Sequence, residues 1–517
     1  MTSKVCILTA GRGTRTGSYS TIINKALLPV NRKAVISHII EKFPQQAEFV
    51  VALGFLRDQV RNYLEIAHPK TKFTFVTVRN FDGPGSGPGL SAQCCSKHLQ
   101  APFYLVSCDT LWEERIDPKS ADDWFGVAAI PASESAQYCN FEIHAGNVTD
   151  IHDKKRVEGP QFKAFVGLCH IQNYKTFWEG IAESGTINGE SQVSKGIKAV
   201  LKSHRPFART VTWSDVGTLE KYKEVTSRYE NYDFSKTNEF LYMVNGKVIK
   251  MFADPSITEK RVRKARLGTE VFPAVADHRG QFYSYYLQPG KTLYEEIDSK
   301  KFSELLSFLD RKLWRSNDVP EAEMRKICRK FYYDKTIERR NLYQRKYGLQ
   351  DTPTVVNGVK IGTTAGLLES VPWEVLFEGK PAFMHGDLQF DNIIFDRGAG
   401  KFTLLDWRQD FAGQVEFGDL YYDLAKLYGG ILLNYVGIKA NQFSYSEQGG
   451  EIRFELPKTD TSYITQLEAF VASKILDMRR VRILVGLIYL NMSPLHHFPF
   501  DKMLYSLSRL TLSKELV

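Results

Sequence analysis

The chain of 517 residues lacks the long apolar segments that membrane proteins need. Its longest apolar run, Ile483 to Leu490, has eight residues, whereas a membrane-spanning helix needs about 20. The apolar stretch before Gly11 has six residues and is too short for a secretory signal peptide. We therefore expect a cytoplasmic protein without membrane insertion.

Cysteine is scarce and irregularly spaced. The chain has seven cysteines, an odd number that does not suit a fully paired disulfide framework. The one adjacent pair, Cys94 and Cys95, has no further Cys or His at the spacing of a zinc site. Reduced thiols, as in a cytoplasm, are the simplest interpretation.

Repeats, low-complexity segments and a strong charge imbalance are also absent. The net charge of +9 is modest for this length, and the basic residues are scattered. This favours an enzyme that handles nucleotides and phosphates over a protein that binds nucleic acid. From the length and the motifs below we expect three units, at residues 1–228, 229–300 and 301–517. A homo-oligomer is compatible with the sequence.

A glycine-rich turn follows the first short β-type run, Lys4 to Thr9. Gly11 and Gly13 would let backbone N–H groups approach a triphosphate, and Arg15 adds positive charge. Lys25, about ten residues later, could reach the same phosphates. The turn alone is a weak signal, and this lysine strengthens it.

Strands and helices then alternate in the rhythm of a doubly wound α/β sheet, which binds ligands at the carboxyl ends of its strands. Asp109 lies just past the apolar strand at residues 103–107, and Asp215 precedes a helix at residues 219–228. Two such carboxylates could hold one magnesium ion. Asp215 could equally be the N-cap of its helix.

These segments resemble the sugar-phosphate and choline-phosphate nucleotidylyltransferases over roughly the first 225 residues. The family motifs appear in order as LTAGRGTR, NKALLPV and WSDVGT. The resemblance implies a Rossmann-like domain in which a nucleoside triphosphate and magnesium bind the residues Gly11, Gly13, Arg15, Lys25, Asp109 and Asp215. It implies a catalytic role for Lys25, and it makes Lys154 a candidate contact for the acceptor phosphate.

Two departures from the family bear on the base. Asn24 replaces the proline usual in sugar-activating members, which favours CTP as the nucleotide. The segment Gly87-Pro88-Gly89-Leu90-Ser91-Ala92 stands where many members have G-T-A-x-A. It should lie beside the base, so Gly89 is a candidate nucleotide-binding residue.

The second half contains the stretch FMHGDLQFDNIIFDRGAGKFTLLDWRQD from Phe383 to Asp410. Asp387 can take a hydroxyl proton, and Asn392 and Asp406 can hold magnesium at either end of a hairpin. The alternative is that all three are ordinary turn residues. Their order, each beside an apolar run, favours a phosphotransferase site.

Upstream, two β runs joined by Asn245-Gly246 predict a hairpin. Its second run carries Lys250, which could pair with ATP phosphates or be a surface lysine on an edge strand. Glu259 and Glu270 are both candidate partners for it. A glycine-rich G-x-G-x-x-G before this lysine is absent, which argues against a protein kinase.

This half resembles the aminoglycoside phosphotransferase and choline kinase superfamily, whose motif H-G-D-x-x-x-x-N followed by D-W is complete here. The resemblance implies a bilobal, protein-kinase-like α+β domain, with Asp387 as catalytic base and with Asn392 and Asp406 as magnesium ligands. Lys250 would be catalytic and bind ATP. Arg408 would face the acceptor and favour an anionic or polyhydroxylated alcohol over a cation. Core packing is the preferred interpretation of the aromatic residues Trp407, Tyr421, Tyr422 and Tyr428, and a cage for a quaternary ammonium is the alternative.

Together the halves predict a bifunctional enzyme whose partners are a small alcohol, its phosphate and nucleoside triphosphates. ATP would phosphorylate an aminoalcohol, polyol or sugar, and the product would then receive CMP from CTP, with Mg²⁺ at both sites. Such a product would feed surface polysaccharide or lipid decoration. Two alternatives stay open: a sugar kinase fused to a UDP- or GDP-sugar pyrophosphorylase, and a nucleotidylyltransferase with a non-catalytic, regulatory kinase-like module.

Overall fold

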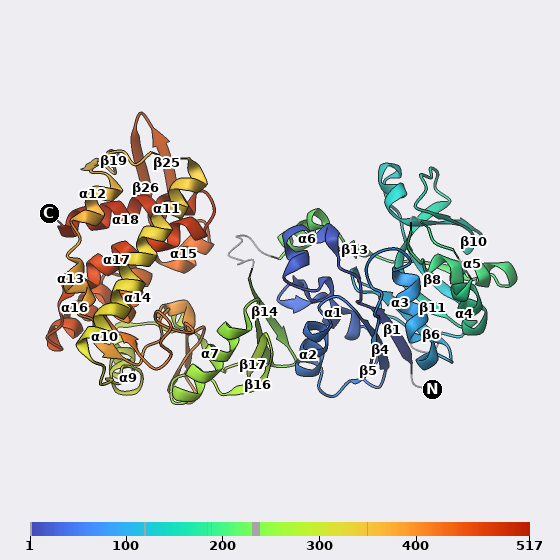
Figure 1. The fold of residues 1–517 in the computed structure, drawn as a ribbon, viewed down its shortest axis with the longest axis horizontal. Coiled ribbons are helices and arrows are strands. Elements are labelled where there is room, and N and C mark those ends of the chain that lie inside the picture. The colour runs from blue at the N-terminus through green and yellow to red at the C-terminus, as the bar shows by residue number, and fades with distance from the viewer. Residues whose placement is uncertain are drawn as a thin grey trace. The chain divides into compact units, whose positions relative to one another are not determined.

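A computed structural model describes residues 3–117, 120–183, 185–187, 189–229, 238–348 and 350–516 (Figure 1). The chain forms two compact units. The first comprises residues 1–255 and 277–284, and the second comprises residues 256–276 and 285–517. The expected boundaries at residues 228 and 300 stay predictions.

A nine-stranded mixed sheet forms the centre of the first unit. Its strand order is β5 (Lys72–Thr77), β4 (Glu48–Leu53), β1 (Lys4–Leu8), β6 (Phe103–Ser107), β11 (Phe162–Ile171), β8 (Trp124–Ala128), β12 (Phe207–Thr210), β10 (Asn147–Asp153) and β9 (Cys139–His144). The first four strands are parallel, as the sequence predicts, whereas β11 runs antiparallel to both β6 and β8.

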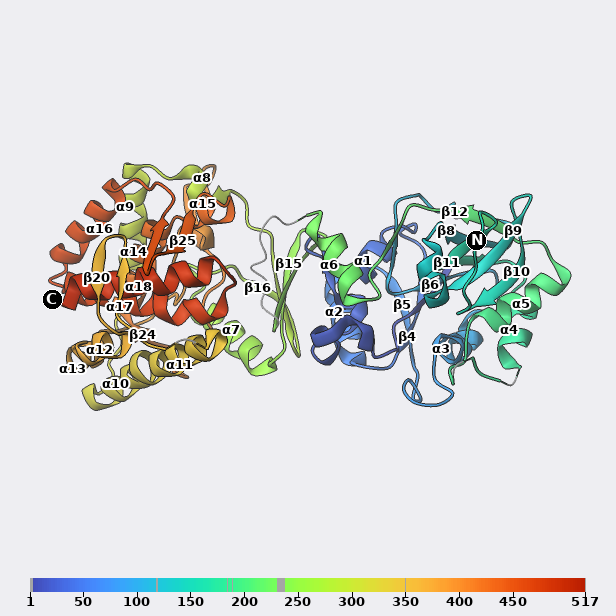
Figure 2. The same ribbon diagram turned by 90° about the horizontal axis from the view of Figure 1, so that it is seen from above.

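Alternate side chains of β1 enter two separate hydrophobic layers. Val5 and Ile7 pack with α1 (Val35–Ile40) and α2 (Arg57–Ala67) on one face of the sheet. Cys6 and Leu8 pack on the other face with residues of three helices, namely α3 (Pro88–Cys95), α4 (Tyr174–Ala182) and α5 (Ser194–Ser203). Figure 2 shows the same elements from above. A strand buried on both faces reads as a continuous apolar run, which is why the sequence revealed it.

The hairpin around Asn245-Gly246 forms as predicted, with both turn residues at positive φ (50° and 72°). Its strands β14 (Glu239–Val244) and β15 (Lys247–Phe252) belong to a sheet of order β14-β15-β17-β16, with β17 at Phe282–Tyr286 and β16 at Val275–Arg279. The apolar side of the hairpin shares the layer of α2, where Tyr242 packs on Tyr63 with a 4.9 Å centroid distance. The hairpin therefore completes the core of the first unit.

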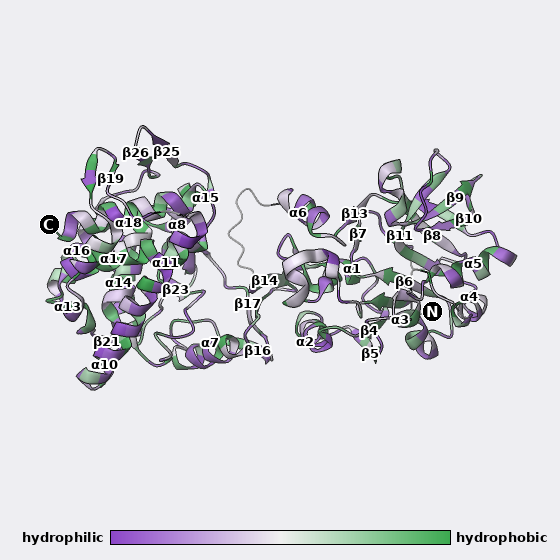
Figure 3. Ribbon diagram, turned by 45° about the horizontal axis from the view of Figure 1, so that its top comes forward, coloured by the Kyte–Doolittle hydropathy of each residue, from purple (hydrophilic) through white to green (hydrophobic). Residues whose placement is uncertain are grey.

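The second unit is mainly helical. Its long segments are α7 (Pro255–Leu267), α9 (Ser299–Phe308), α10 (Glu321–Cys328), α11 (Lys335–Tyr347), α14 (Leu420–Leu433), α16 (Ser462–Ser473), α17 (Met478–Met492) and α18 (Phe500–Leu516). A π-helical segment, Arg329–Asp334, connects α10 to α11, so the helical segment from Glu321 to Tyr347 is continuous. Helices α14, α17 and α18 pack together, and Figure 3 shows green hydrophobic residues along α14 and α17.

Short strands carry the predicted catalytic segment. β18 (Lys291–Thr292), β22 (Ile393–Asp396) and β23 (Lys401–Leu404) form one sheet, in which β22 and β23 are the expected hairpin. Another sheet joins β20 (Val359–Ile361), β19 (Thr354–Val356), β26 (Glu451–Glu455) and β25 (Ser444–Gln448). Across the residues that the structure describes, none of the helices combines the length and the apolar character needed to span a bilayer.

Candidate active sites

A cavity of about 430 Å³ opens at the carboxyl ends of β1 and β6 in the first unit. Seven residues predicted from the sequence line it: Gly11, Gly13, Arg15, Lys25, Asp109, Lys154 and Asp215. They come from five separate segments of the chain, and the fold brings these segments together at one cavity. The predicted ligand position at the strand ends matches this cavity.

Lys25 and Asp109 form an ion pair at its centre, with 2.7 Å between Nζ and Oδ2. Burial alone would lower the pKa of Lys25, but the Asp109 carboxylate outweighs burial and raises it. Burial conversely opposes ionisation of Asp109, but Lys25 and Arg15 hold its pKa below the usual value. Both groups are therefore charged at neutral pH, as a phosphate-binding lysine and a cation ligand must be.

Asp215 lies on the short strand β13 (Trp213–Asp215), which pairs with β7 (Thr110–Trp112) directly after Asp109. It is not the N-cap of α6 (Leu219–Ser227), because Thr218 fills that position and accepts from the Lys221 N–H. Asp215 Oδ1 instead accepts from the backbone N–H of Gly217 at 2.8 Å. The side chain is thus available to the cavity rather than used by the helix.

The two carboxylates meet beside Gly217. A Cβ at Gly217 would lie 3.0 Å from Asp215 Oδ1 and 3.1 Å from Asp109 Oδ2. Carboxylate oxygens facing one another in this way suit a hard cation such as Mg²⁺. This supports the prediction that Asp109 and Asp215 would hold the metal.

Sequence reasoning missed two residues of this site, Tyr138 and Lys221. The Tyr138 hydroxyl donates to Asp215 Oδ2 at 2.8 Å, and burial raises its pKa to about 12. Lys221 Nζ lies 3.7 Å from Asp215 Oδ2 and 2.7 Å from Glu134 Oε2. Lys221 follows the WSDVGT motif in the first turn of α6, which is a usable signal, whereas Tyr138 lies in a loop without one.

Lys154 lines the cavity with its backbone at φ 51° and its Nζ 3.4 Å from Glu190 Oε2. Gly89 does not line the cavity, although its neighbours Gly87 and Pro88 do. A Cβ at Gly89 would lie 2.6 Å from Ser191 Oγ, so this glycine permits close packing of α3 against a loop. The prediction that Gly89 contacts the nucleotide is not supported by this placement.

Asn24 is fully buried and has a structural role. Its amide nitrogen donates to the carbonyls of Thr9 and Phe55, and its oxygen accepts from the Ala26 N–H. It does not line the cavity. The substitution of proline by Asn24 therefore says nothing direct about the base.

Gly217→Ala should weaken nucleotidyl transfer by about tenfold or more, because the added methyl displaces one of two carboxylates that hold the metal. The free Mg²⁺ concentration needed for half-maximal pyrophosphate release should rise in parallel. Gly362→Ala, at an exposed position without a positive φ where a Cβ meets nothing within 4 Å, controls for the loss of a glycine. An unchanged Mg²⁺ requirement in Gly217→Ala would contradict the assignment.

In the second unit, Asp423 holds the segment that carries Asp387. The backbone N–H groups of His385 and Gly386 donate to its carboxylate at 2.7 Å and 2.6 Å. His385 is buried, its Nδ1 accepts from the Asp387 N–H, and its Nε2 lies 2.8 Å from the Leu405 carbonyl. Burial lowers the pKa of His385. A neutral imidazole therefore links the catalytic segment to the segment before Asp406.

Asp387 pairs with Lys426 of α14, with 2.6 Å between Oδ1 and Nζ. Burial works to lower the pKa of Lys426, but Asp387 reverses this and raises it. Asn392 Nδ2 donates to the Asp387 carbonyl at 2.9 Å, which fixes Asn392 beside the predicted base. No role was predicted for Lys426. Only its position in the segment GDLYYDLAKL could have indicated that it lies near the site.

Asp406 has a left-handed backbone (φ 56°), and its Oδ1 lies 2.6 Å from Arg261 NH1 on α7. A non-glycine residue in this region is held there by its surroundings and is common at functional sites. The oxygen of Asn392 and the carboxylate of Asp406 are ligand types that suit Mg²⁺. Arg261 was not predicted from the sequence.

Lys250 is 3% exposed, so it is not a surface lysine. Its Nζ lies 3.8 Å from Glu239 Oε1 on the neighbouring strand β14. Glu270, one of its two predicted partners, instead lies 2.5 Å from Lys312. The predicted binding of ATP by Lys250 stays a prediction.

The aromatic residues near Asp406 follow the core interpretation. Trp407, Tyr421, Tyr422 and Tyr428 are all less than 9% exposed. The Trp407 indole donates to the Arg261 carbonyl, and Arg480 lies over the Tyr421 ring at 4.1 Å. Side chains engaged in this way do not form an open cage.

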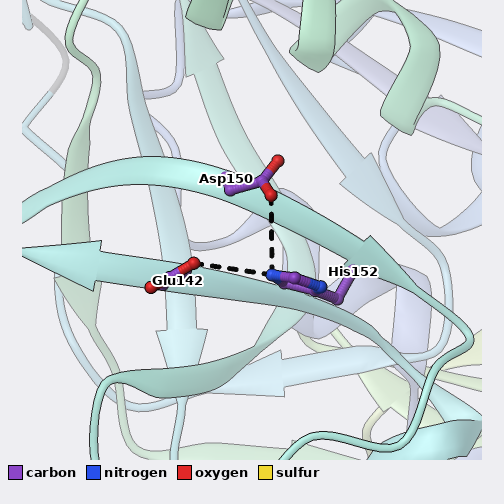
Figure 4. A group of neighbouring side chains, drawn as sticks. All are labelled: Glu142, Asp150 and His152. Atoms are coloured by element: carbon purple, nitrogen blue, oxygen red, sulfur yellow. Dashed lines mark ion pairs between the residues drawn. The ribbon is translucent and has the colours of Figure 1, made fainter.

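One other cluster of ionisable groups lies on the β9–β10 hairpin. Figure 4 shows His152 Nε2 between Glu142 and Asp150, 3.6 Å from an oxygen of each. Within the described parts of the chain this is the one group of three such side chains close enough to share an ion. It does not line the cavity, and no role in catalysis is assigned to it.

Comparison with known proteins matches each half to a separate family. Residues 5–118 match the MobA-like NTP transferase domain, and residues 311–451 match the phosphotransferase enzyme family. Both parts of the expected fold class are confirmed, with the first sheet mixed rather than wholly parallel.

Curated relatives include the bifunctional protein GlmU of two strains of Methanococcus maripaludis. The chain is 21% identical to that of strain C7 over 241 residues, and 23% identical to that of strain C5 over 237 residues. These alignments cover 45% and 44% of this chain and 56% and 55% of the relatives. The chain thus spans about half the length of the curated relatives it matches.

Solved structures similar to the first half include a UDP-glucose pyrophosphorylase complexed with UDP-glucose. It is 19% identical, with a TM-score of 0.39, and 44% of this chain covers 98% of it. The CTP:phosphocholine cytidylyltransferase of Streptococcus pneumoniae is 16% identical, with a TM-score of 0.38, and 44% of this chain covers 100% of it. These values describe distant likeness and assign no substrate.

Proposed function

We propose that the chain, which joins a MobA-like NTP transferase domain to a phosphotransferase domain, catalyses two consecutive reactions. In the first, ATP phosphorylates a small alcohol. In the second, the resulting phosphate receives a nucleotidyl group from a nucleoside triphosphate, and pyrophosphate leaves. The observation that carries the proposal is that both halves of one chain hold a complete set of reactive side chains.

The phosphotransferase step begins with Asp387. Its carboxylate accepts the proton of the alcohol, whose oxygen then forms a bond to the γ-phosphorus of ATP while the bond to the β-phosphate oxygen breaks. Lys426, paired with Asp387, orients the carboxylate. Asn392 and Asp406 would hold magnesium, which neutralises phosphate charge when bound.

The nucleotidyl step uses the cavity of the first unit. An oxygen of the alcohol phosphate attacks the α-phosphorus of the nucleoside triphosphate, and the α–β bridging oxygen departs with pyrophosphate. Lys25 and Arg15 supply positive charge to the triphosphate, and Lys154 lies on the same cavity wall to receive the acceptor phosphate. Asp109 and Asp215 would hold the magnesium ion.

CTP is the nucleotide that we expect, and ADP, pyrophosphate and a CDP-alcohol are the expected products. The expectation rests on the resemblance of the second half to choline-kinase-like enzymes, since Asn24 does not line the cavity. Activated alcohols of this kind serve surface polysaccharide or lipid decoration, and the reaction would take place in the cytoplasm.

Product analysis by mass spectrometry tests the proposal. The enzyme is incubated with ATP, one of CTP, UTP or GTP, and a pooled panel of aminoalcohols, polyols and sugars. An alcohol phosphate followed by its CDP derivative supports the proposal. Turnover with UTP or GTP alone would favour a sugar pyrophosphorylase, and a complete lack of ATP consumption would favour a regulatory kinase-like module.

A further inference from the structure

A cluster of three basic side chains lies near the Asp387 segment: Arg408 is beside Gly386, Lys335 is within electrostatic range of Asp387, and Arg339 is one helical turn beyond Lys335. Lys335 and Arg339 come from successive turns of α11, and Arg408 follows Asp406 two residues later. Lys335 Nζ lies 4.3 Å from the centre of the Phe331 ring, and Arg408 Cζ lies 5.0 Å from the same centre. One aromatic ring therefore places two of these cations side by side.

Arg408 is held firmly at this place. Its backbone N–H donates to the His385 carbonyl at 2.9 Å, and its Nε donates to the Asp410 carbonyl at 3.1 Å. Phe331 in turn stacks on Phe411 with a centroid distance of 4.0 Å. Lys335 and Arg408 therefore both lie against a pair of stacked aromatic rings.

Carboxylate partners for these cations are missing from the described part of the chain: Lys335, Arg339 and Arg408 form no ion pair there. Arg339 Nε is buried without a hydrogen-bond partner. Lys426, by contrast, is matched by Asp387. All three side chains are half-buried, and gathering cations partly out of water without an anion is costly unless a bound group compensates them.

The electrostatics place this cluster beside the reacting groups. Burial lowers the pKa of Lys335, and the charges of Arg408, Arg339 and Lys426 lower it further. Asp387 acts on the same lysine in the opposite direction. Lys335 therefore lies within range of the predicted base as well as of the other cations.

We propose that the alcohol phosphorylated at Asp387 carries an anionic group, a carboxylate or a phosphate, that binds Lys335, Arg339 and Arg408. This inference rests on the proposed phosphotransferase function. Guanidinium groups bind carboxylates and phosphates through paired hydrogen bonds. A quaternary ammonium at the same place would meet the like charges of Arg339 and Arg408. The acceptor is thus an acidic alcohol rather than a choline-like cation.

Matched alcohols test the charge preference. Initial rates of ADP release are measured with glycerol, D-glycerate and glycerol 3-phosphate, and with choline, ethanolamine and L-serine. In at least one series, a member that carries a carboxylate or a phosphate should have a kcat/KM about tenfold or more above its relatives without an anionic group, as one charge-assisted hydrogen bond implies. Comparison of kcat/KM for D-glycerate and for glycerol 3-phosphate shows whether the site prefers a carboxylate or a phosphate. Equal or better use of glycerol or choline would overturn the inference.

Variants test the residues. Arg339→Met and Arg408→Met should each raise the KM for the acidic alcohol about tenfold or more, with the KM for ATP unchanged and Arg339→Lys retaining most of the affinity. Arg345→Met, an exposed cation on the same helix, is the matched control. If the KM for ATP rises instead, the cluster binds the nucleotide phosphates and the inference is wrong.

The proposed function and this inference can fail separately. If no alcohol consumes ATP, the phosphotransferase function is wrong. Calorimetric titration of D-glycerate, glycerol phosphate and L-serine, into the wild type and into Arg339→Met, still tests the cluster. Binding that the variant loses supports the anion site, and the absence of binding to the wild type rejects it.

Discussion

Asp387→Asn should reduce ATP-dependent phosphorylation of the alcohol by about 10³-fold, within the range for loss of a general base. An amide cannot take the hydroxyl proton, and it leaves Lys426, 9% exposed, without its carboxylate. Nucleotidyl transfer to a supplied alcohol phosphate should stay within about twofold of wild type, because Asp109 and Asp215 belong to the other unit. ADP release and pyrophosphate release, measured on the same preparation, give the two rates.

Asp391→Asn is the matched control for this substitution. Asp391 lies in the same loop but pairs with Lys439, at 2.5 Å, and an ion pair of this kind contributes about 1 kcal/mol or less. Its phosphotransferase rate should change little. If Asp387→Asn retains more than a tenth of the wild-type rate, Asp387 is not the base. Loss of both activities would instead indicate misfolding, which circular dichroism would reveal.

Asp109→Asn should have the complementary effect and lower nucleotidyl transfer by about 10³-fold, as expected when a group that positions metal and phosphate is lost. The substitution removes half of the carboxylate pair beside Gly217 and leaves Lys25 without its partner at 2.7 Å. The pKa of Lys25 should then fall, because burial is no longer opposed by Asp109. Phosphorylation of the alcohol by ATP should continue.

Pyrophosphate release from each nucleoside triphosphate with a supplied alcohol phosphate measures this effect. Asp58→Asn is the control, since Asp58 lies in the exposed first turn of α2. Accumulation of the unconverted alcohol phosphate in a reaction that starts from the alcohol would confirm that the two steps follow one another. A nucleotidyl rate within tenfold of wild type would show that Asp109 does not hold the metal.

Much of the first site is predictable from the sequence because its residues lie in short segments whose position is set by the adjoining strand. The turn after β1 and the residue after β6 occupy their positions through the strands alone, so Gly11, Gly13 and Asp109 reach one cavity. Gly89 and Asn24 show the limit of this reasoning. Both occur in motifs at ligand-binding positions, yet their side chains or Cβ positions face the protein interior.

Residues that act across elements could not be predicted. Tyr138 and Lys221 meet Asp215 from a loop and from a helix, and Arg261 reaches Asp406 from α7. Such pairs depend on distances between elements far apart in the chain, which motif spacing does not encode. Arg408 was predicted as an acceptor contact, whereas no role was predicted for Lys335, which shares the Phe331 ring with Arg408 only in the folded chain.

By itself the sequence determined the order of strands and helices, the two sets of candidate site residues and the absence of long apolar segments. Those properties are local, because hydrophobic periodicity and turn residues act over a few positions. Only the tertiary structure decided that the hairpin of Lys250 completes the core of the first unit, that Asp109 and Asp215 converge on Gly217, and that Lys335 and Arg408 share one aromatic ring near Asp387. Packing between distant segments sets these arrangements, and with them the electrostatic character of each site.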